Sequence, residues 1–314
     1  MTIDKAAEYF LTSLEIDQLS KHTIKAYTQD LRQFISVIKK DELNELDFQD
    51  FESYFSLFKN LKVTSLKRKR IVVHRFLKFC YRKKFCQEKL YEYIDPIRSK
   101  KDTAPKEVLK PKEIETIFDS IKSEQDQYEM RLDSTYYAYL YYCSVRNELL
   151  ISILLYTGCR ANEVVSLKKE SIDLEQNTIT LYTKGSKYNK VPIHHLLNLK
   201  FTIYNDNIKK LPTEIKSHLD NTEFLFPSKD DIYKAMSTRT LHDIMKRLSA
   251  LLNRHIHAHI FRHTFASYCI ASNMDISTIS SLISHSNPSI TLSIYTHEIS
   301  TNNKQEQIKK LNFN

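Results

Sequence analysis

Apolar residues recur at helical spacing through most of the chain, and this pattern predicts a mainly helical protein. Residues 20–38 (SKHTIKAYTQDLRQFISVI) place Ile24, Leu31 and Phe34 on one face of a helix. Ser20, which opens this segment, is a residue type that often caps a helix N-terminus. Residues 64–85 (TSLKRKRIVVHRFLKFCYRKKF) repeat the helical pattern, so the first third of the chain is expected to be helical.

The helix expected at 64–85 has one apolar stripe, and basic residues cover much of its remaining surface. The stripe, which we expect to be buried, consists of Leu66, Val72, Val73, Phe76 and Cys80. Between Glu52 and Glu88 the sequence has eleven basic residues and not one acidic residue. A charged run is usually a solvated helix face, but this one lacks the acids that would relieve its repulsion, which favours a polyanionic partner. The candidate DNA contacts are Lys67, Arg70, Arg75 and Lys78.

A stretch rich in proline and charge, DPIRSKKDTAPKEVLKPKEI, divides the chain and has the composition of a linker. It places a boundary between about 96 and 110. We expect an N-terminal helical DNA-binding domain at 1–100, a linker at 101–110 and a second domain at 111–314. The second domain is expected to end in a short amphipathic tail whose apolar residues are Ile308, Leu311 and Phe313.

The second domain is predicted to be mostly helical with a small three-stranded antiparallel β-sheet. A buried helix at 147–158 is expected to end at Gly158, because glycine tolerates the left-handed backbone of a helix end. The other glycine of the chain, Gly185, is expected in a hairpin turn. The three strands are expected at SIDL (171–174), NTITLYT (177–183) and KVPIH (190–194), with the turn at 184–189.

Composition narrows the class of protein further. The chain has 314 residues, of which 41% are hydrophobic, and no apolar run approaches membrane-spanning length. Its five cysteines are scattered without CxxC spacing, which favours a reducing, cytoplasmic location over a disulfide framework or a zinc ribbon. The net charge of +9 again points to a polyanionic partner. No cofactor, metal or membrane partner is expected.

Three separate stretches carry side chains suited to phosphoryl transfer. YTGCRANEVVSL has an arginine and a glutamate three residues apart, HIFRHTFAS has two histidines and an arginine, and ISHSNPSITLSIYTH has a histidine and a tyrosine ten residues apart. Two guanidiniums can hold the oxygens of a phosphodiester and stabilise its transition state. A tyrosine hydroxyl can attack phosphorus if a neutral histidine takes its proton, and a lysine in the hairpin could protonate the leaving oxygen. No carboxylate cluster for magnesium accompanies them.

With these motifs in order, the chain resembles the tyrosine recombinases, also called λ-integrase-type or Xer-type recombinases. TGCRANEVVSL is similar to the first box of the family, HIFRHTFA to the second, and SHSNPSITLSIYTH to the third. LSKHTIKAYTQDLRQF is more loosely similar to the N-terminal helical DNA-binding domain of the family. The resemblance implies that the second domain is the catalytic domain.

The resemblance implies a role for each residue of the boxes. Tyr295 would be the nucleophile that forms a 3′-phosphotyrosyl bond, and Arg160 and Arg262 would hold the scissile phosphate. The remaining implied residues are the general acid Lys184, the proton-transfer residue His259, the phosphate-binding His285, Glu163 beside Arg160, and a supporting His263. The implied partner is double-stranded DNA with inverted-repeat half-sites, bound by a dimer per site and a homotetramer on two sites. Strand exchange would pass through a Holliday junction without ATP, an activating partner protein is possible, and the tail could dock on a neighbouring protomer.

The sequence departs from the family pattern at three places. Ser284 stands before the third-box histidine where the family usually has glycine, so the geometry of that turn is open. Lys187 and Lys190 also lie in the hairpin, which makes Lys184 the best of three lysine candidates. Residues 123–144 are longer than expected before the first box and could form an added helix that contacts another protomer.

Other functions remain open on the sequence alone. A zinc hydrolase could use His255, His257, His259 and His263, although no carboxylate or cysteine nearby completes a site. A DNA-binding regulator could keep the fold without cleaving DNA, and a type IB topoisomerase shares the chemistry. The sequence distinguishes neither the target site nor chromosome-dimer resolution from mobile-element integration or excision.

Overall fold

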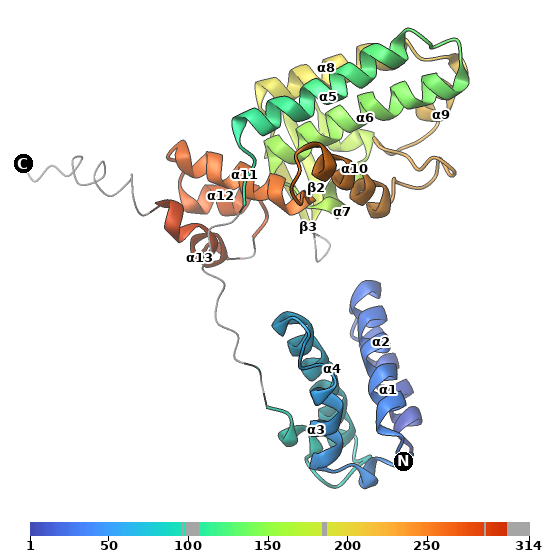
Figure 1. Cartoon of the computed structure of the whole chain (residues 1–314), viewed down its shortest axis with the longest axis vertical. Helices are drawn as coiled ribbons and strands as arrows, with labels where there is room; N and C mark the ends of the chain where they lie inside the picture. Colours follow the sequence, from blue (N-terminus) through green and yellow to red (C-terminus); the bar gives the residue numbers. More distant parts are fainter. Residues whose placement is uncertain (96, 98–106, 184–186, 286, 300–314) are drawn as a thin grey trace, which may run out of the picture. The chain divides into compact units, whose positions relative to one another are not determined.

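The computed structural model describes residues 1–95, 97, 107–183, 187–285 and 287–299, without the side chains of 293 and 295–299. The chain divides into two compact units, Met1–Asp102 and Thr103–Asn314 (Figure 1), and each has its own hydrophobic core. Most of the described chain is helical, with one small sheet. None of the described helices combines the length and the apolar character needed to cross a membrane.

The first unit is a helical bundle. Its helices are α1 (Ile3–Ile16), α2 (Lys21–Ile38), α3 (Phe48–Ser56) and α4 (Val63–Arg82), with short 3-10 helices at Leu43–Glu45 and Leu90–Tyr93. The cap predicted for α2 is confirmed, because Ser20 Oγ accepts a hydrogen bond from the backbone nitrogen of Thr23 at 3.2 Å. Asp47 caps α3 in the same way.

The apolar stripe of α4 forms much of the core of the first unit. Val72, Val73, Phe76 and Cys80 are completely buried, as predicted, whereas Leu66 is only half-buried. The core continues into α1 and α2 through Phe10 and Phe34, among others. Because the stripe is committed to this core, most basic residues of α4 lie at its sides and outer face, whereas Lys69 is buried.

Helix α6 (Thr135–Thr157) is the central helix of the second unit. It contacts α5 (Pro111–Glu129), α8 (His195–Lys209) and α11 (Ala258–Ala271), and Figure 1 shows α5, α6 and α8 side by side. Apolar side chains lie on all sides of α6, as expected for a helix buried on most of its circumference. The suggestion of a separate added helix at 123–144 is wrong, whereas a contact of this stretch with another protomer stays a prediction. These residues are the end of α5 and the start of α6, where Tyr141 and Tyr142 belong to the core.

The sheet of the second unit has the predicted three antiparallel strands in the order β1-β2-β3. They are β1 (Ile172–Asp173), β2 (Thr178–Thr183) and β3 (Lys187–Pro192). Ile179, Leu181 and Val191 are buried against the helices, which fixes the face that the sheet presents to the core. Strand β3 begins three residues before the predicted start, because Lys187 pairs with Thr183. The turn residues 184–186, including Gly185, lie outside the described residues.

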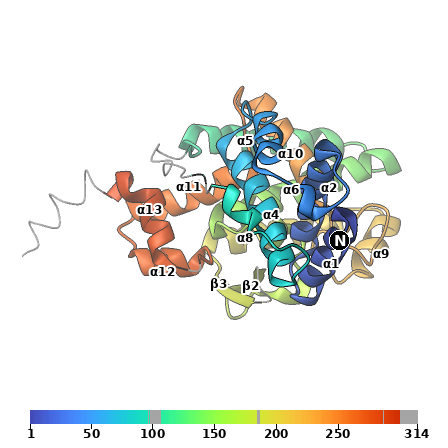
Figure 2. The same ribbon diagram turned by 90° about the horizontal axis from the view of Figure 1, so that it is seen from below.

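The remaining helices complete the second unit. They are α7 (Ala161–Val165), α9 (Thr213–Asp220), α10 (Thr238–Leu251), α12 (Ile276–Leu282) and α13 (Pro288–Ile299), with a 3-10 turn at Lys169–Ser171. Helices α11, α12 and α13 contact one another and lie together at one end of the unit (Figure 2). Ala266, Ile279 and Ile283 belong to a small separate core at this end. The tail at 300–314, with Ile308, Leu311 and Phe313, lies outside the described residues.

Candidate active site

Arg160 is positioned by the abrupt end of helix α6. Gly158 ends the helix with φ +61°, as predicted, and a Cβ atom there would lie 2.6 Å from the Phe265 ring. Arg160 follows as the N-cap of α7, and its backbone nitrogen donates to Glu163 Oε2 at 2.7 Å. The Arg160 guanidinium binds the other oxygen of this buried carboxylate at 2.9 Å. Glu163 therefore fixes both the backbone and the side chain of Arg160.

Arg262 lies on α11, and its side chain also reaches the end of α6. Its guanidinium is buried and donates to the backbone oxygen of Gly158 at 2.9 Å and to that of Ile283. Arg160 donates to the next backbone oxygen, that of Ser284, at 3.1 Å. The two arginines therefore converge on the turn of residues 283–285 between α12 and α13, which is called the 283–285 turn below.

The 283–285 turn has an unusual backbone and a distant anchor. Ser284 has φ +54°, a left-handed conformation that glycine adopts at lower cost. The Asn189 amide, on strand β3, donates to Ser284 Oγ at 2.7 Å and to the backbone oxygens of Leu282 and Ser281 at 3.0 and 3.1 Å. Sequence reasoning missed Asn189, because its partners are more than ninety residues away and no local pattern marks them.

The two predicted histidines lie beside the arginines. The pKa of His285 is lowered to about 4, first by burial and then by the charges of Arg262 and Arg160. Its Nδ1 atom is 2.8 Å from Oγ1 of the buried Thr291. His259 is exposed on one side, but partial burial, followed by the same two arginines, also lowers its pKa. His263 is half-buried and contributes to the low pKa of His285.

Two of the predicted residues lie wholly or partly outside the described part of the structure. Tyr295 lies in α13, one helical turn after Thr291, but its side chain is outside the described part of the structure. Lys184 immediately follows strand β2 and also lies outside the described residues. The structure therefore brings together Arg160, Glu163, His259, Arg262 and His285, and leaves the nucleophile and the general acid as predictions.

The histidine cluster does not have the geometry of a metal site. Within the described residues, no three histidine, cysteine, aspartate or glutamate side chains are arranged to hold a metal ion. The arrangement expected for the zinc hydrolase alternative is therefore not found in that part of the chain.

The four predicted DNA contacts on α4 differ in exposure. Arg75 and Lys78 are exposed, whereas Lys67 and Arg70 are half-buried. Arg70 donates to the backbone oxygen of Asp95 at 3.0 Å and lies over the Phe55 ring at 4.9 Å. The outward charge of Arg75 and Lys78 makes them the stronger candidates.

Part of the basic run on α4 is neutralised within the protein. Lys69 is buried, and its Nζ atom is 2.9 Å from Asp30 Oδ1 on helix α2. Arg68 donates to the same oxygen at 3.1 Å. The acids that α4 lacks in its own sequence are thus partly supplied by a neighbouring helix.

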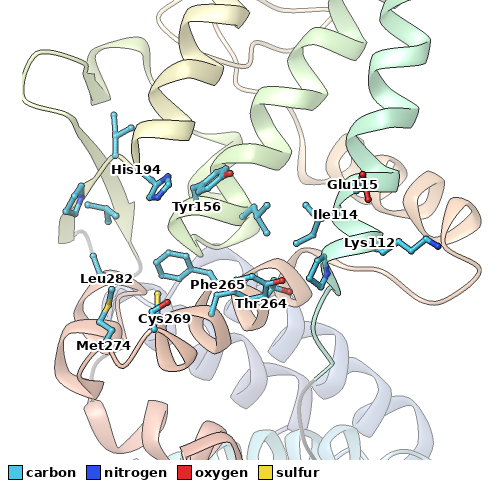
Figure 3. Close-up of a pocket in the computed structure, with 17 residues that line it drawn as sticks. Lys112, Ile114, Glu115, Tyr156, His194, Thr264, Phe265, Cys269, Met274 and Leu282 are labelled. Atoms are coloured by element: carbon cyan, nitrogen blue, oxygen red, sulfur yellow. The ribbon is translucent and has the colours of Figure 1, made fainter. Parts of the chain in front are cut away.

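A large apolar cavity lies next to the candidate site but does not include it. It has a volume of about 1150 Å³ and is bordered by the start of α5, the end of α6, β3, α11 and α12 (Figure 3). Leu155, Ile193, Phe265 and Leu282 are among its apolar walls, and the His194 ring stacks on that of Tyr156. Neither arginine nor His259 or His285 lines it, so the cavity is not the phosphate site.

Comparison with known proteins decides the family. The model of the phage integrase family matches residues 107–301, and the model of the phage integrase N-terminal SAM-like domain matches residues 7–84. The chain belongs to the phage integrase family. The predicted resemblance to tyrosine recombinases, the assignment to this class of enzyme and the mainly helical fold class are confirmed.

Relatives and solved structures agree with this assignment. Tyrosine recombinase XerC of Staphylococcus aureus (strain bovine RF122 / ET3-1) is 28% identical over 98% of this chain and 95% of its own. The crystal structure of XerH site-specific recombinase bound to difH substrate shares the fold with TM-score 0.64 and 22% identity, over 92% of this chain and 78% of that one. A lambda integrase tetramer bound to a Holliday junction gives TM-score 0.67 and 12% identity over the same shares.

Proposed function

We propose that the protein is a site-specific DNA recombinase that cuts and rejoins DNA strands through a 3′-phosphotyrosyl intermediate, without a metal ion or ATP. One observation carries this proposal. Arg160 and Arg262, from elements a hundred residues apart, converge with His259 and His285 on the 283–285 turn, which leads into the helix of Tyr295. Paired guanidiniums beside neutral imidazoles suit a phosphodiester.

The proposed cleavage step gives each of these residues a role. The Tyr295 hydroxyl attacks phosphorus, the phosphorus–O5′ bond breaks, and the 5′-oxygen leaves. Arg160 and Arg262 stabilise the negative charge that grows on the non-bridging oxygens. The tyrosine proton passes to His259, and the leaving oxygen takes a proton from Lys184. The number of phosphate ester bonds is unchanged, so the reverse reaction with a new 5′-hydroxyl rejoins the strand without ATP.

The lowered pKa values support these roles for the histidines. A base must be neutral to accept the tyrosine proton, and the low pKa of His259 keeps it neutral at pH 7. His285 is neutral for the same reason, and its Nδ1 is engaged by Thr291. The other ring nitrogen of His285, Nε2, is therefore the one available to hydrogen-bond a phosphate oxygen. Lys184 is preferred to Lys187 and Lys190, which both lie within strand β3.

We further propose that the protein binds double-stranded DNA with inverted-repeat half-sites, as a dimer on each site and a tetramer on two. The DNA-bound structures of proteins with this fold support this assembly, one of them a tetramer on a Holliday junction. The reaction is expected in the cytoplasm. An accessory protein that activates the recombinase is also possible. Chromosome-dimer resolution and mobile-element integration or excision use the same chemistry, and the DNA site distinguishes them.

A nicked suicide DNA tests the proposal. It would carry a chromosomal or element-end site taken from the neighbourhood of the gene, with a chelator present throughout. We expect a covalent protein–DNA band on a denaturing gel for the wild type and none for Tyr295→Phe. DNA binding without a band from either protein would favour the regulator, and relaxation of supercoiled DNA without site preference would favour a topoisomerase.

A further inference from the structure

Arg146 is a buried cation without an acidic partner among the described residues. It lies on α6 with only 7% of its surface exposed. Its Nε and Nη2 atoms both donate to the side-chain oxygen of the neighbouring Asn147, at 3.2 and 2.9 Å. The guanidinium also lies 5.8 Å from the Tyr142 ring centroid. The Nη1 group takes part in none of these hydrogen bonds.

This arrangement is costly for the folded protein by itself. A buried charge normally needs an opposite charge or a full set of hydrogen bonds, and one amide oxygen provides neither. The buried hydroxyl of Tyr142 beside it also lacks a hydrogen-bond partner within the described structure. A buried guanidinium whose hydrogen bonds go to a single amide oxygen, beside a buried hydroxyl without a partner, indicates that something else completes the site.

Arg146 and Tyr142 both line a cavity of about 250 Å³ between α6, α9 and the segment at 227–229, which is called the Arg146 cavity below. Its polar lining is mainly basic or aromatic, with Arg146, Lys229, His218 and Tyr139. Lys229 Nζ lies 5.0 Å from the Tyr139 ring centroid. Glu214 is the acidic residue of the lining, and it is exposed to solvent, as is Lys229. Ile215, Leu219 and Pro227 add apolar walls.

We propose that the Arg146 cavity binds a small oxyanion, a phosphate or carboxylate group carried on a short apolar body. The planar fork of a guanidinium matches two oxygens of such a group, and Lys229 adds a second positive charge. The volume is below the usual range of cavities for drug-sized ligands, which excludes a complete nucleotide. No residue of the cavity belongs to the candidate active site, so this binding is separate from DNA cleavage.

Phenyl phosphate, inorganic phosphate and the uncharged benzyl alcohol are suitable probes. Every protein in the test carries Arg160→Gln, so that phosphate binding at the candidate active site does not contribute. We expect phenyl phosphate to bind saturably in calorimetry and to raise the melting temperature, whereas benzyl alcohol does neither. Arg146→Met should abolish both effects. The matched control is Arg131→Met, because Arg131 also lies over a tyrosine ring, that of Tyr137, but is exposed.

The stability of the variant without ligand is a second readout. Arg146→Met is expected to melt at the same or a higher temperature, because it removes an unpaired buried charge. If Arg146→Met fails to fold, Arg146→Lys replaces it in the test. Lysine keeps the positive charge but loses the planar guanidinium that can bind two oxygens, so the affinity for phenyl phosphate should fall about tenfold. The proposal is overturned if phenyl phosphate does not bind, or if it binds the Arg146 variants as well as the control. A loss of DNA affinity in Arg146→Met would also overturn it, because the cavity would then hold a DNA phosphate.

Discussion

At the scale of single residues, the backbone at Ser284 determines where the two arginines can point. Arg262 is bound to the carbonyl of Ile283 and Arg160 to that of Ser284, and these carbonyls are separated by the left-handed residue. A different conformation at Ser284 would turn one carbonyl away from its arginine. The sequence shows that glycine is missing here, and the structure shows that serine keeps the glycine-like conformation with the help of Asn189.

Replacing Ser284 separates the two contributions to this turn. Ser284→Ala loses the hydroxyl that accepts from Asn189 and keeps the backbone strain, so we expect it to lower the free energy of unfolding by about 1 kcal/mol. Ser284→Gly loses the same hydrogen bond but relieves the strain, and should be more stable than the alanine variant by about 1 kcal/mol. Chemical denaturation measures both. Equal stability of the two variants would show that the left-handed conformation carries no cost.

The pKa of His259 predicts the pH dependence of cleavage. The base form is required, and burial together with Arg262 and Arg160 lowers the pKa from its ordinary value of 6.5. The neutral form therefore persists to lower pH, and the rate of single-turnover cleavage at limiting enzyme should fall only below pH 6.5. His259→Asn should be slower and should lose this acid limb. An acid limb above pH 6.5, or one that the variant retains, would contradict the assignment of His259 as the base.

At the scale of elements, the start of the second unit is anchored to the helix that carries Arg262. The backbone nitrogen of Leu109 donates to Oγ1 of Thr264 on α11 at 2.8 Å. Arg254, just before α11, binds both oxygens of Glu113 at 2.6 and 3.0 Å and the backbone oxygen of Val108 at 2.9 Å. The hydrogen bond from Arg254 is also the largest cause of the lowered pKa of Glu113. The segment before α5 is thus fixed to the scaffold of the site.

Removal of Arg254 tests the strength of this anchor. Arg254→Met should destabilise the protein by about 2 kcal/mol, because it breaks charge-assisted hydrogen bonds in a partly buried place. Arg247→Met is the matched control, since Arg247 pairs with Glu124 while its side chain is 60% exposed, and such pairs contribute little. Thermal and chemical unfolding of the two variants gives the comparison. A loss in Arg254→Met no greater than in the control would mean that the segment is not held by this contact.

The elements also show how far sequence reasoning reaches. Local sequence signals predicted the helical spacing of apolar residues, the N-cap at Ser20 and the end of a helix at Gly158. The structure has each of these features. The three sequence boxes were sufficient to predict that Arg160, Arg262, His259 and His285 lie at one site. Contacts between distant segments carry no local signal, so the anchoring of the 283–285 turn by Asn189 was missed. The same holds for the pairing of Lys69 with Asp30, and for the start of strand β3, which cross-strand pairing determines.

At the scale of the whole molecule, each of the two units matches a domain model of phage integrases. The two family models match 7–84 and 107–301, and together they cover most of both units. The eleven basic residues between Glu52 and Glu88 do not translate directly into DNA contacts, because some of them are paired with an acid inside the protein. Lys69 and Arg68 share Asp30, whereas Arg75 and Lys78 remain exposed.

Salt dependence distinguishes the exposed from the paired lysines of α4. If Lys78 contacts a phosphate, Lys78→Ala should weaken binding for all DNA sequences and reduce the slope of log affinity against log salt by about one unit. Lys69→Met should leave the slope unchanged, because Lys69 is buried against Asp30. Fluorescence anisotropy at several salt concentrations measures the slopes. An unchanged slope for Lys78→Ala would remove Lys78 from the DNA interface.

The most direct test of the central claim is the identity of the protein–DNA bond. The covalent complex trapped on suicide DNA would be digested with a protease, and the DNA-linked peptide analysed by mass spectrometry. We expect the 3′-phosphate of the cleaved strand on Tyr295, with a free 5′-hydroxyl on the other fragment. Attachment to another residue, or through a 5′-phosphate, would contradict the tyrosine recombinase mechanism proposed for this site.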